Sequence, residues 1–261
     1  MRATATLNEI RLSRLKAGES DILIVYSVES KEFTATAIER NGMVDLDLEC
    51  PCSQKKEELI NHLSEAAIEV GRISIKAGYN GGEECLSCTV AAILTSAYAL
   101  AKTINVMEDI EASQEMRAIL ASSLLGGINI YSFGSRTPAL LRYFYPSEFI
   151  KAITIQSQQY RKNMVVSRDT IFSIIEGLSL IYAGENEQGT KILLKASNSF
   201  YSGSELPIIP LTTGDIILLP SSTSCSSFLM SLGSKIADYL KDRGNMARIS
   251  RLGRGATVLI D

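Results

Sequence analysis

Residues 73–88 read ISIKAGYNGGEECLSC, and this stretch decides the fold that the sequence predicts. It opens with a short strand, passes through three glycines, and leads into an uncharged apolar run over residues 85–101 that is typical of a helix. A glycine-rich loop between a strand and a helix is a general phosphate-binding device, because backbone N–H groups converge there and the helix dipole favours negative charge. The stretch therefore predicts a strand, a candidate phosphate loop and a helix.

The charges of this loop argue against phosphate binding. Glu83 and Glu84 stand at the start of the predicted helix, where the anionic oxygens of a nucleotide would lie. Carboxylates there stabilise a helix by about 0.3–1 kcal/mol, because they satisfy the same N–H donors. The spacing also matches neither the Walker pattern nor G-x-G-x-x-G. Two interpretations stay open: a structural loop with an acidic N-cap, or a nucleotide-binding loop formed by Gly78, Gly81, Gly82 and Ser87.

The chain before this unit has the pattern of antiparallel strands. Residues 2–12 partly alternate apolar and polar side chains, and residues 21–28 and 31–39 are runs rich in β-branched residues, separated by a short polar turn. Asn41-Gly42 then marks a hairpin. From residue 54 to residue 70 the apolar period changes to three and four, which predicts an amphipathic helix.

Helices and strands are mixed in the rest of the chain. A helix is predicted over residues 113–124, and Gly126-Gly127 ends it before a strand over residues 128–133. Pro138 and Pro146 bracket a basic and aromatic connection over residues 141–145, where we place a domain boundary. The segments predicted beyond it are a strand over 150–155, a helix over 169–183 capped by Ser167, a helix over 188–201, a strand over 215–219, a helix over 232–241, and strands over 246–249 and 256–260. This order predicts an α+β fold with two domains, residues 1–145 and 146–261.

Composition excludes several classes of protein. With 261 residues, of which 46% are hydrophobic, the chain can form a core without disulfide staples. A formal charge of −3 creates no field that would attract nucleic acid or anionic lipid, so we expect neither as a partner. The N-terminus does not resemble a secretory signal, and the uncharged runs do not have the pattern of membrane spans, so we expect a cytoplasmic protein.

The single histidine limits the mechanisms that are open to the chain. Any histidine general base must be His62, which falls at the polar edge of the predicted helix over residues 54–70. A lone histidine in that position is typical of a solvated or locally hydrogen-bonded side chain. We therefore expect no catalytic role for it.

The order of segments resembles the GHMP kinase superfamily, and within it the archaeal type of shikimate kinase. The resemblance rests on residues 73–78 leading into the apolar helix, on the stretch ASSLLGGI at 121–128, and on the closing segment 239–249. It implies a β-rich N-terminal domain over residues 1–145 that carries the phosphate loop, and a ferredoxin-like domain over residues 146–261. It also implies transfer of a phosphoryl group from ATP, with Mg²⁺, to the hydroxyl group of a small molecule such as shikimate.

The motifs that carry chemistry in this family are altered here. Its phosphate loop, a Gly-Leu followed by serines and an alanine, corresponds to GGEECLS at residues 81–87. Its acidic pair corresponds to Ala118 and Ile119, which can neither take a proton nor hold Mg²⁺, and Glu115 is the nearest displaced acid. Its glycine-rich turn corresponds to LPSSTSCS at 219–226, which places Ser221, Ser222 and Ser224 at nucleotide-binding positions.

Losing all three motifs together is severe for phosphoryl transfer, which depends on positioning and on charge neutralisation. We therefore expect a divergent or noncatalytic homologue, a pseudoenzyme that binds a small acidic metabolite or a nucleotide, and a homo-oligomer remains open. The alternative is an active kinase that uses ATP and Mg²⁺.

Two further groups of side chains suggest other chemistry. Cys50, Cys52, Cys85 and Cys88 have spacings that can hold zinc or an iron–sulfur cluster, although free cysteines in an apolar helix also pack as small hydrophobes. Basic residues gather in the second half of the chain, where they are either solvated charges or an anion site facing a domain cleft. These residues are Arg136, Arg142, Lys151, Arg161, Lys162, Arg243, Arg248, Arg251 and Arg254.

Overall fold

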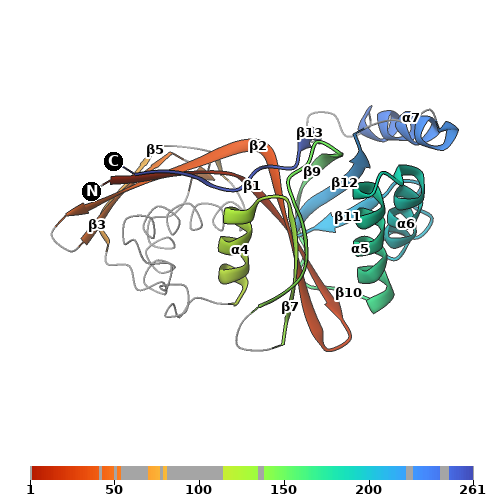
Figure 1. The fold of residues 1–261 in the computed structure, drawn as a ribbon, viewed down its shortest axis with the longest axis horizontal. Helices are drawn as coiled ribbons and strands as arrows, with labels where there is room; N and C mark the ends of the chain where they lie inside the picture. Colours follow the sequence, from red (N-terminus) through yellow and green to blue (C-terminus); the bar gives the residue numbers. More distant parts are fainter. Residues whose placement is uncertain are drawn as a thin grey trace.

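The computed structural model describes residues 2–40, 43–49, 52–53, 70–76, 79–80, 114–134, 138–221, 226–241 and 247–260. Its elements form a large mixed sheet and a smaller antiparallel sheet, with helices packed against both (Figure 1). The predicted α+β fold is confirmed. No helix in the described part of the chain is long and apolar enough to cross a membrane.

A long hairpin organises the large sheet. Strands β1 (Arg2–Ala17) and β2 (Ser20–Arg40) pair in antiparallel fashion, from Arg2 opposite Ile38 to Ala17 opposite Ser20. The sequence predicts two strands where β2 is continuous, and the prediction of a break is wrong. At the irregularity, Asn8 pairs with Glu32 whereas Glu9 pairs with Val28, so β2 accommodates the polar residues between them without ending.

Strands from both ends of the sequence complete this sheet. On β2, strands β3 (Met43–Glu49) and β7 (Ile128–Phe133) pair in antiparallel fashion, and β5 (Val70–Lys76) runs parallel to β3. On β1, strand β10 (Met164–Val166) is parallel and β14 (Thr257–Ile260) is antiparallel. The two termini therefore lie side by side (Figure 1). A separate pair is formed by β4 (Cys52–Ser53) and β6 (Tyr79–Asn80).

The segment that the sequence predicts to be a connection between domains is a strand. Residues 141–145 belong mostly to β8 (Ala139–Phe144), which pairs with β7. Pro138 and Pro146 flank this strand rather than interrupt it, so its backbone N–H groups stay available for pairing. The division into domains at residue 145 stays a prediction.

The smaller sheet has the order β11-β12-β9-β13 and is antiparallel throughout. Its strands are β9 (Ile150–Tyr160), β11 (Ile208–Leu211), β12 (Thr213–Pro220) and β13 (Ala247–Arg251). Strand β11 is not predicted from the sequence, because it is short and contains Pro210. Proline is tolerated there because β11 lies at the edge of the sheet.

Helices cover the two faces of this small sheet. Helices α5 (Arg168–Tyr182) and α6 (Asn186–Asn198) share one hydrophobic core with Ile216 and Leu218 of β12. Helix α7 (Ser227–Lys241) packs against Ile217 on the opposite face. The predicted cap of α5 is confirmed, since the Thr170 N–H donates to the Ser167 side chain over 3.2 Å.

Helix α4 (Gln114–Leu125) contacts the large sheet at β1, β2 and β7. The helix ends at two glycines with left-handed backbone, Gly126 at φ 70° and Gly127 at φ 68°. A Cβ atom on Gly127 would lie 2.1 Å from the Phe144 carbonyl oxygen, so only glycine fits the turn into β7. The predicted break between this helix and the following strand is thereby explained.

Candidate functional site

Most of the residues that the sequence singled out lie outside the described part of the chain. These are Gly78, Gly81, Gly82, Glu83, Glu84, Ser87, His62, Cys50, Cys85, Cys88, Ser222 and Ser224. Cys52 is placed only as part of the backbone of β4. The nucleotide-binding and metal-binding roles of these residues therefore remain predictions.

The two positions that the sequence analysis aligns with the acidic pair of the kinases are closed to solvent. Ala118 is 0% exposed and Ile119 is 1% exposed, and both lie within α4. Their carbonyl oxygens accept hydrogen bonds from Ser122 Oγ and Ser123 Oγ, each over 2.8 Å. The side chains at these two positions of α4 are therefore apolar and buried.

The displaced acid, Glu115, is bound by an arginine from β1. Arg14 Nε donates to both carboxylate oxygens over 3.1 Å, and Arg14 Nη2 also donates to Oε1. Arg14 Nη1 donates to the Tyr160 hydroxyl over 2.8 Å. One guanidinium thus joins α4, β1 and the end of β9, and it neutralises the carboxylate of Glu115.

A second ion pair lies on the other face of β1. Arg11 Nη2 and Glu9 Oε1 are 2.6 Å apart, and both side chains are buried. Ser13 follows on the same face and donates to the Pro210 carbonyl oxygen over 2.7 Å, which ties β1 to β11 of the small sheet. Burial raises the pKa of the neighbouring Tyr26 hydroxyl well above its ordinary value. Polar side chains therefore fix the junction of the two sheets.

Ser221 and Ser226, which belong to the segment that the sequence analysis aligns with the third kinase motif, both form hydrogen bonds to other segments. The Ser221 N–H donates to the Phe149 carbonyl oxygen over 2.7 Å. At the other end, Ser226 Oγ donates to Glu187 at the start of α6, and Glu187 also accepts from Lys191 Nζ over 2.6 Å. These hydrogen bonds lower the pKa of the Glu187 carboxyl, with that of Lys191 contributing most.

The predicted cluster of basic residues is dispersed in the structure. The side chains of Arg142, Lys151, Lys162, Arg248, Arg251 and Arg254 are exposed. Arg136 and Arg243 lie outside the described residues. Arg161 lines a pocket, at the connection that follows β9.

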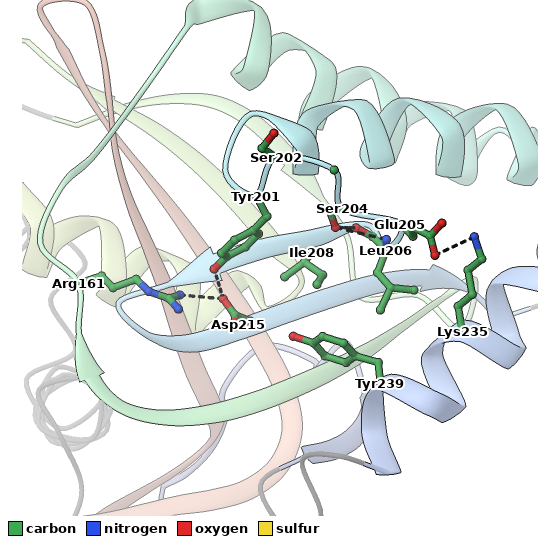
Figure 2. A pocket seen from close by; sticks show the side chains of 11 residues that line it. Arg161, Tyr201, Ser202, Ser204, Glu205, Leu206, Ile208, Asp215, Lys235 and Tyr239 are labelled. Carbon is green, nitrogen blue, oxygen red and sulfur yellow. Dashed lines mark hydrogen bonds and ion pairs between the residues drawn. The ribbon is translucent and has the colours of Figure 1, made fainter.

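This pocket has a volume of about 470 Å³ and lies between the loop at residues 201–206, strand β12 and helix α7 (Figure 2). Asp215 lies at the polar end of the pocket. Its side chain faces α7, because side chains alternate along a strand and Ile217, two residues further on, packs against α7. Asp215 Oδ1 accepts hydrogen bonds from Arg161 Nη1, over 2.7 Å, and from the Tyr201 hydroxyl. Arg161 Nη1 also donates to the Gly214 carbonyl oxygen over 2.6 Å, which fixes the guanidinium against β12.

Tyr201 is neutral, because its surroundings raise the pKa of its hydroxyl. Burial raises the pKa of Tyr201, and the hydrogen bond to Asp215 and the charge of that carboxylate raise it further. Figure 2 shows Tyr201 on one side of Asp215 and Tyr239 on the other, with both hydroxyl ends turned toward the carboxylate. At the far end of the pocket, Lys235 Nζ and Glu205 Oε2 are 3.1 Å apart. The pocket thus has a half-buried ion pair at one end and an exposed one at the other.

Comparison with known proteins identifies the architecture. No sequence profile of a known family and no curated protein sequence matches the chain. Among solved structures, a Listeria monocytogenes protein described as a homoserine kinase aligns with a TM-score of 0.55 and 12% identity over 100% of both chains. Mevalonate-3-kinase from Thermoplasma acidophilum, with mevalonate bound, gives a TM-score of 0.51 and 12% identity over 99% of this chain and 98% of its own. Mevalonate diphosphate decarboxylase from Enterococcus faecalis gives a TM-score of 0.55 and 11% identity over 99% of each chain.

The chain has the GHMP-kinase fold. The resemblance found in the sequence is confirmed at the level of the fold, and at 10–13% identity the neighbours show the fold alone. The closer resemblance to shikimate kinase stays a prediction. The correspondence of Ala118 and Ile119 with the acidic pair also stays a prediction.

Sequence reasoning missed most of the residues of the pocket. It singled out Arg161 but not its partners Tyr201 and Asp215, nor Lys235 and Glu205. One local signal was available, since Asp215 interrupts the otherwise apolar strand β12 directly after Gly214. The other members come from three separate segments, so their convergence depends on the tertiary fold.

Proposed function

We propose that this chain is a divergent homologue of the ATP-dependent small-molecule kinases, which keeps the GHMP-kinase fold for ligand binding and has lost phosphoryl transfer. The observation that carries the proposal is the nature of three side chains on α4. Ala118 and Ile119 are buried and apolar, and Glu115, the acid one turn before them, has both carboxylate oxygens bound by Arg14. A small acidic metabolite as ligand and a cytoplasmic location are part of the same proposal.

The physical argument concerns what phosphoryl transfer requires. Mg²⁺ is held by oxygen ligands, and a general base must reach the proton of the acceptor hydroxyl. The methyl group of Ala118 and the alkyl side chain of Ile119 supply neither function. A carboxylate in a bidentate pair with arginine already uses its lone pairs and its charge. The loss therefore affects metal binding and proton transfer together, which is severe for a reaction that depends on charge neutralisation.

One observation favours an active kinase as a second candidate. Glu115 is three residues before Ala118, so its side chain lies on the same side of α4, and it is 32% exposed. If Arg14 released it, Glu115 could replace the missing acid. In that case ATP and Mg²⁺ would be the cofactors, as one neighbour of 10% identity was solved with AMPPCP and magnesium. Shikimate would be the first acceptor to test, because the sequence resembles the archaeal shikimate kinases.

A radiolabelled phosphoryl-transfer assay separates the two candidates. The full chain is incubated with γ-labelled ATP, Mg²⁺ and, separately, shikimate, homoserine or mevalonate as the acceptor. We expect no acceptor-dependent transfer above the background of the Glu115→Gln variant. Transfer that requires an acceptor and is lost in Glu115→Gln, while the Glu185→Gln control keeps it, would contradict the proposal and establish the active kinase.

A further inference from the structure

We propose that the pocket between the loop at residues 201–206, strand β12 and helix α7 binds a small hydroxy acid or amino acid. The carboxylate of the ligand is bound by Lys235, and its hydroxyl or ammonium group donates to Asp215. The site lies on the α7 face of the small sheet, whereas α4 packs on the large sheet. It is therefore independent of the phosphoryl-transfer question and goes beyond the proposed function.

The polar end of the pocket presents a preorganised hydrogen-bond acceptor, the carboxylate of Asp215. Asp215 is 14% exposed in its side chain, and its Oδ1 atom is fixed by Arg161 and Tyr201. Asp215 lines the pocket, and the contacts from Arg161 and Tyr201 both go to Oδ1. A carboxylate that lines a pocket selects a hydrogen-bond donor, such as a hydroxyl or an ammonium group.

Arg161 makes this end stable without blocking it. Its Nη1 atom donates to Asp215 and to the Gly214 carbonyl oxygen, so the ion pair is anchored to the backbone of β12. Its Cζ atom lies 6.0 Å from the centre of the Tyr201 ring, in the range of a cation–π contact. Because the pair is half-buried and hydrogen-bonded on both sides, it stays formed when a ligand enters.

The other end of the pocket can open. The Lys235 and Glu205 side chains are 44% and 70% exposed, and an ion pair that is so exposed contributes little to stability. Glu205 can therefore turn into solvent at small cost and leave the ammonium group of Lys235 to an incoming anion. Lys235 comes from α7 and Glu205 from the loop, so a bound carboxylate replaces the contact that now joins the two walls.

The loop wall is already ordered for binding. Ser204 Oγ donates to the Leu206 carbonyl oxygen over 2.8 Å and accepts from Ser197 Oγ over 3.2 Å. The Ser204 N–H donates to the Tyr201 carbonyl oxygen over 3.0 Å. A loop that is fixed by its own hydrogen bonds loses little conformational entropy when a ligand arrives, which favours binding.

Size and charge define the class of ligand. A volume of about 470 Å³ suits a small metabolite, and the buried side chains of Leu206 and Ile208 give an apolar wall for its carbon chain. The two basic side chains of the pocket are balanced by Asp215 and Glu205. A polyanion such as a nucleoside triphosphate would be repelled by these carboxylates, whereas a ligand with one carboxylate and one donor matches both ends.

A ligand-observed NMR titration of the full chain, without nucleotide, tests this site. The probes are ω-hydroxy acids and ω-amino acids of increasing chain length, with the matching fatty acids and alkylamines as controls that lack one group. We expect a length at which the hydroxy or amino acid binds and both controls bind at least about tenfold more weakly. Preference for the hydroxy series or for the amino series identifies the donor.

Three variants locate the binding. Lys235→Met is expected to weaken the best probe by about tenfold, because a charge-assisted hydrogen bond is lost, and Glu205→Gln is expected to strengthen it because the competing carboxylate is removed. Lys241→Met is the matched control, since Lys241 is an exposed lysine on the same helix, and it should leave the affinity unchanged. Absence of binding to the wild-type chain, or binding that is equal in Lys235→Met and Lys241→Met, would overturn the proposal whatever the phosphoryl-transfer assay shows.

Discussion

Arg14 and Glu115 are 101 residues apart in the sequence, yet the Nε atom of Arg14 lies 3.1 Å from both carboxylate oxygens of Glu115. This pair joins the first strand of the large sheet to α4, the helix that contains Ala118 and Ile119. The same contact that holds the helix in place also neutralises the carboxylate of Glu115.

The Arg14–Glu115 contact is expected to stabilise the fold through its geometry. Arg14→Lys keeps the positive charge but loses the bidentate hydrogen bonds, so we expect the free energy of unfolding to fall by about 1–2 kcal/mol. Urea denaturation measures this change. Lys16→Gln serves as the control, because Lys16 is exposed on the same strand and should change stability by less than about 0.5 kcal/mol. Equal effects of the two substitutions would show that the bidentate geometry contributes nothing.

Part of the fold can be predicted from the sequence because its signals are local. The strand at residues 128–133 is predicted with the bounds that the structure shows, since Gly126-Gly127 mark the only backbone that can make that turn. The continuity of β2 could not be predicted. It depends on a register shift against β1 at Asn8, which is a property of the pair of strands and not of one of them.

The pocket could not be predicted for a related reason. The sequence singles out Arg161 by its charge alone. Its role in the pocket depends on Asp215 and Tyr201, which are 54 and 40 residues further along the chain. The alternation of β12 shows that Asp215 faces the same way as Ile217, yet it does not show that α7 covers that face. Tertiary packing supplies this information.

Tyr201 is expected to stay protonated in alkaline solution. Burial and the Asp215 carboxylate raise its pKa above the ordinary value of 10.0, so its stabilising contribution is complete below pH 10 and is lost as the pH rises above it. In an absorbance titration at the phenolate band, Tyr201, like the buried Tyr26, should therefore be missing from the phase that titrates near pH 10. Tyr201→Phe should leave that ordinary phase unchanged, whereas Asp215→Asn should move the titration of Tyr201 toward lower pH, because the charge of Asp215 is removed while the burial of Tyr201 stays. A smaller ordinary phase in Tyr201→Phe would contradict the assignment.

Glu187 is expected to make stability depend on acid pH. Its pKa is lowered by Lys191 and by Ser226, so the stabilisation is present above the ordinary pKa of 4.5 and is lost as the pH falls through the lower value of the folded state. Thermal unfolding should show Glu187→Gln less stable than the wild type at pH 7, with the difference closing at pH 3. Glu185→Gln controls for the loss of one charge at this end of α6. A difference that persists unchanged at pH 3 would show that the ionised carboxylate is not its cause.

Gly214 is expected to be essential for the position of Asp215. Its φ is +104°, and a Cβ atom there would lie 1.9 Å from the Ile155 carbonyl oxygen, so Gly214→Ala should cost more than about 3 kcal/mol. Gly203→Ala is the matched variant, because Gly203 also has a positive φ, +74°, but its Cβ would meet nothing within 4 Å. It should cost only about 1 kcal/mol, the strain of the backbone alone. Equal losses in urea denaturation would show that the close approach at β9 is relieved by a small shift.

Gly233 is a position in α7, the helix that provides one wall of the pocket, where alanine is expected to stabilise the protein rather than destabilise it. It lies inside the helix, and a Cβ atom there would meet nothing within 4 Å. Alanine restricts the unfolded chain more than glycine does, so Gly233→Ala should stabilise the protein by about 0.5–1 kcal/mol. The substitution adds no group near Lys235 that could bind an anion, so the affinity of the pocket for the probe acids should stay the same. Stabilisation in urea together with unchanged binding would show that α7 can be strengthened without altering the site, whereas weaker binding would mean that the wall must move to admit its ligand.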